Sequence, residues 1–201
     1  MTAGALDVLA RIRADRPEPA PYECCELCSA PVADAHQHLV DVDSRSLLCA
    51  CRPCYLLFTR ADAQLAYRSV PDRVLALPDL PLPVWESLQL PVGTAFLLHS
   101  SAVQRVVAIY PGPAGATESA LELDAWEQVV AACPALSTLA PDVEALLVRA
   151  SGQRVEAFVV PVDVGYELVG TLRALWRGFD GGSEVHQRLA GFFDDLRGRA
   201  R

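Results

Sequence analysis

The chain has 201 residues, of which 52% are hydrophobic and 21% are charged, and its formal net charge is −8 at pH 7. A chain of this length buries one substantial core, or one core and a small appended module. The acidic balance and the lack of a concentrated basic run argue against a protein that binds phosphate backbones, so we expect no nucleic-acid partner.

The sequence contains no lysine and no asparagine, which excludes a Schiff-base enzyme and a phosphate-binding loop of the Walker type. No segment approaches the roughly 18 uninterrupted apolar residues that cross a bilayer, and the first residues lack the apolar region of a signal peptide. We therefore expect a cytoplasmic protein without a membrane span. In a reducing compartment, clustered cysteines are typical of metal or redox sites rather than of disulfides.

Proline-rich stretches divide the chain into three parts. Residues 1–21 contain ALDVLARIRA, whose apolar spacing predicts a short helix, and then a linker with three prolines. Residues 22–75 form a cysteine-rich module. A second proline-rich piece, LPDLPLPVW, follows, and the remaining part, residues 76–201, is a second domain.

The second domain contains an internal repeat. LLHSSAVQRVVAIYP begins at Leu97 and LLVRASGQRVEAFVVP begins at Leu146, so that two copies of QRV align without a gap. Each copy predicts a strand, a turn, a strand, a proline-containing loop and a helix. The helical segments are LDAWEQVVAA and YELVGTLRALWRGF, and SEVHQRLAGFFDDLRGR forms a last helix. Two ββα units predict a two-layer α+β domain, with a four-stranded, mainly antiparallel sheet and helices on one face.

The strongest motif lies in the module, where CELC (Cys25, Cys28) is followed after twenty-two residues by CRPC (Cys51, Cys54). Two such pairs let four thiolates converge at about 2.3 Å from one tetrahedral zinc ion. Rubredoxin also uses two CxxC pairs, but its turns continue into glycine, whereas Ser29 and Tyr55 follow here. We therefore expect zinc, with iron as the alternative.

The segments around these pairs predict a treble-clef or zinc-ribbon-like module. HLVDVDSRSLLCAC has two alternating stretches around the turn-forming DSR and predicts a β-hairpin. PCYLLFTRADAQLAY predicts a helix with proline at its start. A turn with two cysteines, a hairpin, and a helix with cysteines at its N-terminus follow one another in the order of a treble-clef zinc finger.

Further potential ligands surround the four cysteines. On a strand, residues i and i+2 face the same way, so His36 and His38 share one face, and Cys49 shares a face with Cys51. These residues either replace part of the four-cysteine set, hold a second metal ion, or merely pack beside one zinc ion. Cys24, next to a predicted ligand, is a bystander.

Outside the module, candidate sites are weak. YPGPAGATES, residues 110–119, predicts a glycine-containing loop ahead of a helix, where an anion can meet free amides, although a plain surface connection is the simpler interpretation. We interpret His99 and His186 as structural histidines. Cys133 has no companion, and no catalytic constellation is evident.

A set of motifs from Tyr22 to about Phe193 carries a resemblance to a known family. The motifs are CELC, HQHL, LLCACRPCYLLF, YPGPAGATES, PDVEALLV, VPVDVGYELVG, and WRGF with GGSEV. The chain resembles an uncharacterised bacterial family of unknown function that is encoded beside high-affinity uptake nickel–iron hydrogenases. The resemblance implies an accessory role in hydrogenase maturation or assembly, with the four motif cysteines as ligands and His36, His38 and Cys49 as additional members of the motif.

Three functions are consistent with these patterns. The first is a non-enzymatic, zinc-binding accessory protein that contacts a hydrogenase subunit or another maturation protein. The second is a rubredoxin-like iron electron carrier for a hydrogenase. The third is a metal-dependent enzyme that uses an open His/Cys site. We expect the first.

Overall fold

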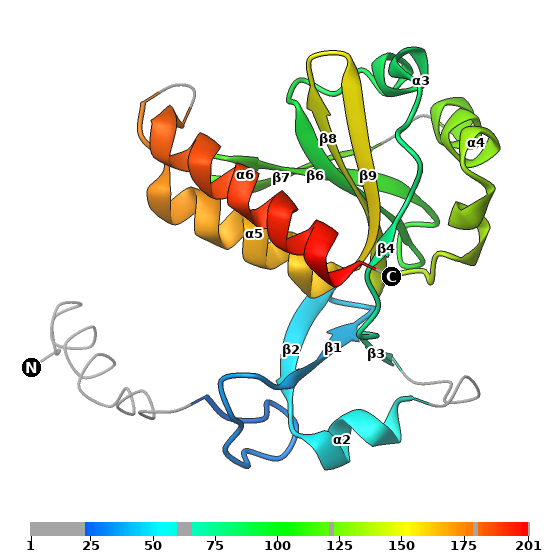
Figure 1. The fold of residues 1–201 in the computed structure, drawn as a ribbon. Helices are drawn as coiled ribbons and strands as arrows, with labels where there is room; N and C mark the ends of the chain where they lie inside the picture. Colours follow the sequence, from blue (N-terminus) through cyan, green and yellow to red (C-terminus); the bar gives the residue numbers. More distant parts are fainter. Residues whose placement is uncertain (1–22, 60–65, 121–122, 179–180, 201) are drawn as a thin grey trace, which may run out of the picture.

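The computed structural model describes residues 23–59, 66–120, 123–178 and 181–200, and the helix predicted at residues 5–14 lies outside them. The described chain is a mixed α+β protein with two antiparallel sheets (Figure 1). The smaller sheet belongs to the cysteine-rich module and has the order β2-β1-β3. Its strands are β1 (Gln37–Asp41), β2 (Ser46–Ala50) and β3 (Tyr67–Ser69).

The larger sheet has six strands in the order β4-β9-β8-β5-β6-β7, so the prediction of a four-stranded sheet is wrong. The four predicted strands form its centre. The edge strand β7 comes from the segment 110–119 and the residue after it, where a loop was predicted, and the edge strand β4 lies directly before the proline-rich piece LPDLPLPVW. Its strands are β4 (Leu75–Ala76), β5 (Thr94–Ser100), β6 (Arg105–Gly112), β7 (Gly115–Ala120), β8 (Glu144–Ser151) and β9 (Arg154–Pro161).

The segment 110–119 is a hairpin and not a loop ahead of a helix. Strand β6 pairs with β5 only as far as Ile109, and beyond it pairs with β7 alone. Pro111 is tolerated there because a strand with one neighbour leaves its other side without ladder hydrogen bonds. The chain then turns through residues 113–114, and Gly115 adopts φ of 113°, which favours glycine. The loop predicted ahead of a helix is therefore absent at these residues, and with it the alternative of an anion site on that loop.

Helices cover both faces of the large sheet, so the predicted two-layer arrangement is also wrong (Figure 1). Because side chains alternate along β5, Phe96 packs with helices α5 and α6, whereas Leu97 packs with α3 and α4 on the other face. The helices are α2 (Arg52–Leu57), α3 (Leu82–Ser87), α4 (Leu123–Ala132), the 3-10 helix η1 (Pro134–Thr138), α5 (Val162–Leu175) and α6 (Gly182–Arg199).

The internal repeat holds for the hairpins but not for the helices. Hairpins β5–β6 and β8–β9 join through an antiparallel β5–β8 pair, and the aligned residues Leu97 and Leu146 pack on the same face. In the first copy, β7 adds a strand before α4, which reaches one face, whereas α5 follows β9 directly and covers the other. The extra strand breaks the symmetry.

In the module, the predicted hairpin is present with a four-residue turn. The helix predicted at residues 53–67 is present at its start and wrong at its end, and residues 60–65 of that prediction lie outside the described residues. Helix α2 ends at Leu57, and Tyr67 lies in β3, where it pairs with Asp41 of β1. Strand pairing with β1 thus overrides the helical spacing at the end of this segment. Strand β3 pairs within the module and β4 pairs with β9, so residues 70–74 pass from one sheet to the other.

An ion pair between the partly exposed Arg73 and the buried carboxylate of Glu144 lies at this crossing. Arg73 donates from Nε to Glu144 Oε1 at 2.7 Å and from Nη2 to Oε2 at 2.6 Å, while the Glu144 side chain is only 2% exposed. The Ala140 amide donates to the same carboxylate at 2.9 Å.

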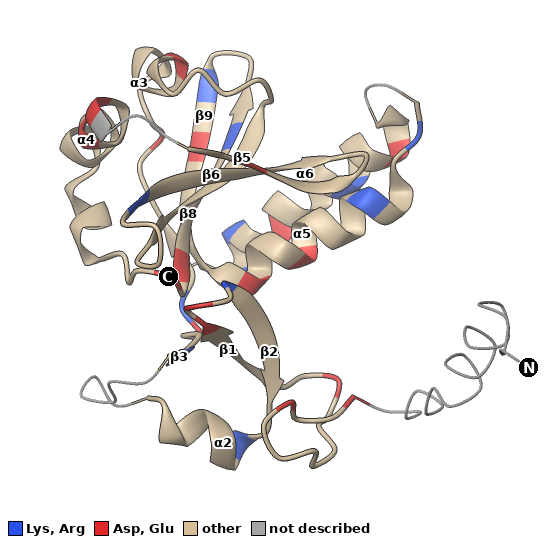
Figure 2. Cartoon of the chain, turned by 180° about the vertical axis from the view of Figure 1, so that it is seen from behind, with Lys and Arg blue, Asp and Glu red and all other residues tan. Residues whose placement is uncertain are grey.

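Over the described chain as a whole, basic and acidic residues are interspersed along the ribbon, without a continuous basic stretch (Figure 2).

We predict that Arg73→Met lowers the free energy of unfolding by about 3 kcal/mol, because it leaves a buried carboxylate without its cation. Urea denaturation of the purified protein measures the change. The control is Arg154→Met, which removes an exposed pair with Asp79, whose side chains are 63% and 46% exposed. It also removes a 3.8 Å contact with Glu156, which keeps Arg197 at 3.2 Å, so the variant should cost less than about 1 kcal/mol. Equal losses in the two variants would contradict the prediction.

Candidate metal centre

The first two cysteines lie in a tight turn before β1. The Cys25 amide donates to the Ala30 carbonyl at 2.8 Å, and the Ser29 amide donates to the Cys25 carbonyl at 2.7 Å. Ser29 adopts a left-handed φ of 61°, which reverses the chain directly after Cys28. The turn thereby places two thiols of one CxxC pair side by side.

The other two cysteines lie where β2 ends and α2 begins. Cys51 is the residue before the first turn of α2, its carbonyl accepts the Tyr55 amide at 2.9 Å, and Cys54 lies in that first turn. The Glu26 amide donates to the Cys49 carbonyl at 2.9 Å and so holds the first turn against β2. This contact brings the two CxxC pairs together.

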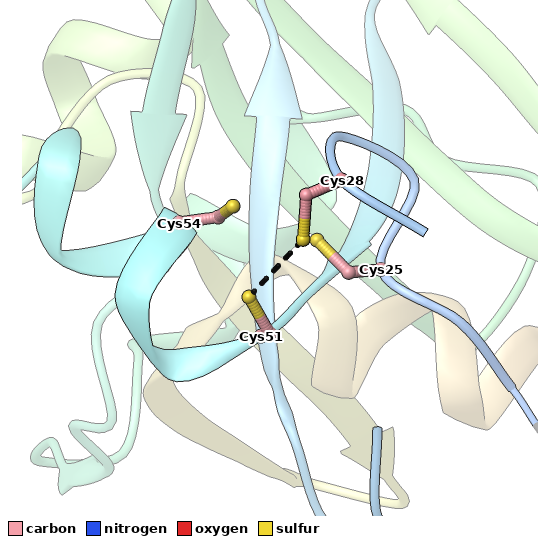
Figure 3. A group of neighbouring side chains, drawn as sticks. All are labelled: Cys25, Cys28, Cys51 and Cys54. Carbon is pink, nitrogen blue, oxygen red and sulfur yellow. Dashed lines mark hydrogen bonds between the residues drawn. The ribbon is translucent and has the colours of Figure 1, made fainter. Parts of the chain in front are cut away.

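The sulfur atoms of Cys25, Cys28, Cys51 and Cys54 all lie within 4.8 Å of one another, and the Cys28 and Cys51 sulfurs are 3.6 Å apart (Figure 3). Four sulfurs at about 2.3 Å from a tetrahedral ion are separated by about 3.8 Å, so the donor set fits one metal ion. The cluster can therefore hold a metal ion, and its geometry is compatible with zinc and with iron.

The four thiols differ in how readily they ionise. Burial opposes ionisation of Cys25, but backbone amides of Cys51, Leu27 and Cys28 donate to its sulfur and lower its pKa to about 6. Interaction with the Cys51 and Cys28 thiols raises the pKa of Cys54 to about 12. Four adjacent thiolates repel one another, so a cation among them is what permits all four to ionise.

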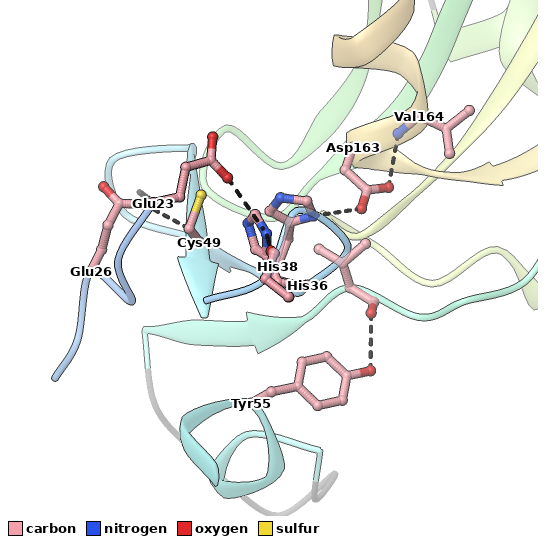
Figure 4. Close-up of polar contacts among 10 residues, drawn as sticks. Glu23, Glu26, His36, His38, Cys49, Tyr55, Asp163 and Val164 are labelled. Atoms are coloured by element: carbon pink, nitrogen blue, oxygen red, sulfur yellow. Dashed lines mark hydrogen bonds and ion pairs between the residues drawn. The ribbon is translucent and has the colours of Figure 1, made fainter. Parts of the chain in front are cut away.

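The other three predicted ligands form a separate group. His36, His38 and Cys49 each offer a donor atom within 4.8 Å of the other two, and Cys49 lies opposite His38 in the β1–β2 register (Figure 4). Burial, together with the charges of Glu23 and Glu26, raises the pKa of the Cys49 thiol. The four-cysteine set is complete without these residues, so they are not needed as replacement ligands.

Sequence reasoning missed Asp163, which accepts a hydrogen bond from His38 Nδ1 at 2.8 Å. It lies in the first turn of α5, 125 residues away in the chain. An aspartate at the start of a helix is common as a helix-terminus residue, so the sequence carried no signal for this contact.

The weaker candidates lie away from both groups. His99 is on β5, His186 is on α6 with its Nδ1 2.7 Å from the Gly182 carbonyl, and Cys133 is buried after α4. Among the described residues, none of these three, nor Cys24, joins a cluster of potential metal ligands.

A family model matches residues 24–200, which include both cysteine pairs and nearly all of the described chain. The chain belongs to DUF5947, a family of unknown function. The cysteines and histidines of both groups thus lie within the DUF5947 region. No curated protein and no solved structure matches the chain. Within the described part of this DUF5947 chain, no helix is both long and apolar enough to cross a membrane.

We predict that Cys25→Ser lowers the zinc content of the purified protein by about one ion per chain, because three thiolates bind structural zinc less well than four. Elemental analysis with quantified protein measures this content. Cys24→Ser is the matched control, since it changes the adjacent thiol outside the four-sulfur cluster. Unchanged metal in Cys25→Ser, or equal loss in Cys24→Ser, would contradict the assignment.

Proposed function

We propose that this protein is a zinc-binding accessory protein that acts in the maturation or assembly of a nickel–iron hydrogenase, through contacts with a hydrogenase subunit or another maturation protein in the cytoplasm. The observation that carries the metal assignment is the set of four sulfurs within 4.8 Å of one another. The resemblance of the motifs to a family encoded beside such hydrogenases supports the choice of partner.

A structural role for the ion in the four-cysteine cluster follows from the number of ligands. Four thiolates complete a tetrahedral shell and leave no position for water or substrate. A zinc ion in this site supplies a cross-link between the turn before β1 and the start of α2. Catalysis at this ion is therefore disfavoured, and the protein is proposed to act by binding rather than by chemistry.

Exposed apolar side chains on the module support a role in protein contacts. Leu56 and Leu57, which are 48% and 66% exposed, lie next to each other on α2, and Leu27 in the first cysteine turn is 36% exposed. Leucine side chains that remain in solvent on a rigid, metal-anchored helix are suited to a partner surface.

The proposal is tested by affinity purification of the tagged full-length protein from cells that express the hydrogenase. We expect the large or small hydrogenase subunit, or a second maturation protein, to co-purify with the wild type. Recovery should fall at least about tenfold with the double substitution Leu56→Glu and Leu57→Glu, because a buried leucine contributes more than 1 kcal/mol to an interface.

Val103→Glu is the matched control, because Val103 is a 36% exposed apolar residue in the β5–β6 turn of the other domain. A folded, zinc-loaded protein that recovers no hydrogenase or maturation component would overturn the proposal. A red protein with a reversible one-electron couple would instead identify an iron electron carrier.

A further inference from the structure

One ring nitrogen of His36 has a lone pair and no partner among the described residues. His36 Nδ1 lies 2.8 Å from the Ala33 carbonyl oxygen, which only accepts, so Nδ1 carries the hydrogen. The lone pair of the neutral ring is then on Nε2. This side chain is only 8% exposed, and Nε2 is buried without a hydrogen-bond partner among the described residues. A buried nitrogen of this kind needs a partner, which an ordered water or a metal ion can supply.

The second histidine is held in the matching tautomer. His38 Nδ1 lies 2.8 Å from Asp163 Oδ2, and Asp163 Oδ1 accepts the Val164 amide at 2.8 Å (Figure 4). A carboxylate that receives the Nδ1 hydrogen fixes the ring and raises the basicity of Nε2, which is how metal-binding histidines are usually supported. His38 can therefore also bind a metal ion through the lone pair of Nε2.

A sulfur completes the set. Cys49 lies opposite His38 in the β1–β2 register, and the two ring centroids of His36 and His38 are 4.8 Å apart. Two imidazoles and one thiol are borderline and soft ligands, which select first-row transition ions and not magnesium or calcium, whose ligands are oxygens.

The group also borders open space. A cleft of about 830 Å³ lies between the module and the start of α5, and its walls include His36, His38 and Asp163. Three protein ligands leave one position of a tetrahedral ion for an exchangeable ligand, in contrast to the closed four-cysteine set.

We propose that His36, His38 and Cys49 bind a second divalent transition-metal ion, separate from the ion in the four-cysteine cluster, with an exchangeable position reached from this cleft. Asp163 is a positioning residue for His38. The inference goes beyond the accessory role and does not rest on it, because it concerns metal content alone and requires no hydrogenase.

The test loads the full-length protein with excess Zn²⁺, removes unbound metal by gel filtration and measures zinc per chain. We expect about two ions in the wild type and about one in His36→Ala and in Cys49→Ser. His186→Ala is the control and should keep both ions, because His186 is an exposed histidine on α6 whose Nδ1 is 2.7 Å from the Gly182 carbonyl.

A positioning role for Asp163 has its own readout. Asp163→Asn should weaken binding of the second ion by about 10- to 100-fold and leave the first ion in place. Competition with a chromophoric chelator measures both affinities. If the His38–Asp163 contact served only to hold the module against α5, the affinity for the second ion would not change.

X-ray absorption of the Co²⁺-loaded wild type keeps the proposal testable even where a variant fails to fold. We expect nitrogen and sulfur ligands in the wild type, and sulfur alone in His36→Ala. A wild type that holds one ion with sulfur ligands only would overturn the second site. So would a second ion that both His36→Ala and Cys49→Ser retain.

Discussion

The meeting of four thiols at one point is the constraint on which the front of the molecule depends. Helix α2 buries none of its six residues, and in the turn before β1 Cys25 is the residue that is fully buried. Apolar burial therefore contributes little to holding this turn and this helix together. In small modules of this kind, a metal cross-link replaces the missing core, and binding of the ion becomes part of the folding free energy.

The β1–β2 hairpin connects the four-cysteine region to the large sheet. At one end it leads into Cys51, and at its turn Arg45 pairs with Glu118 of β7. Between them, Val40 joins the core cluster formed by α5, α6 and the sheet, and His38 contacts Asp163. His38 and Cys49 thus lie on the hairpin, and His36 lies directly before β1, at the place where the two sheets approach one another.

The parts of the site that could be predicted from the sequence are those that depend on residues close together in the chain. CxxC spacing identified the four sulfurs, and alternation on either side of DSR predicted a hairpin with His38 on one strand and Cys49 on the other. The four-residue turn, which the structure shows, sets these two residues opposite each other. The contact to Asp163 depends on how α5 packs after the chain has built a second sheet, so no local pattern contains it. For the same reason, spacing alone left open whether the histidines belonged to the first cluster.

The fold was predictable at its centre and not at its margins. Strands β5, β6, β8 and β9 have apolar residues on both faces, which the sequence displays as repeated runs. Strand β7 carries polar residues, and β4 has only two residues, directly before a proline-rich piece, so neither has the pattern of a buried strand. An edge strand pairs on one side alone and tolerates such a sequence. The prediction of two layers is wrong because β7 follows β6 and the chain then reaches the opposite face of the sheet, where α4 packs.

Strand β7 also bears on how molecules of this protein meet one another. It is the last strand of the sheet, and an edge of this kind presents unpaired backbone groups that recruit strands from other chains. Here the exposed positions carry Thr117, Glu118 and Ser119, and Arg45 reaches across to the central one. Polar side chains and the paired guanidinium make this edge of the folded sheet a poor template for a strand from another molecule.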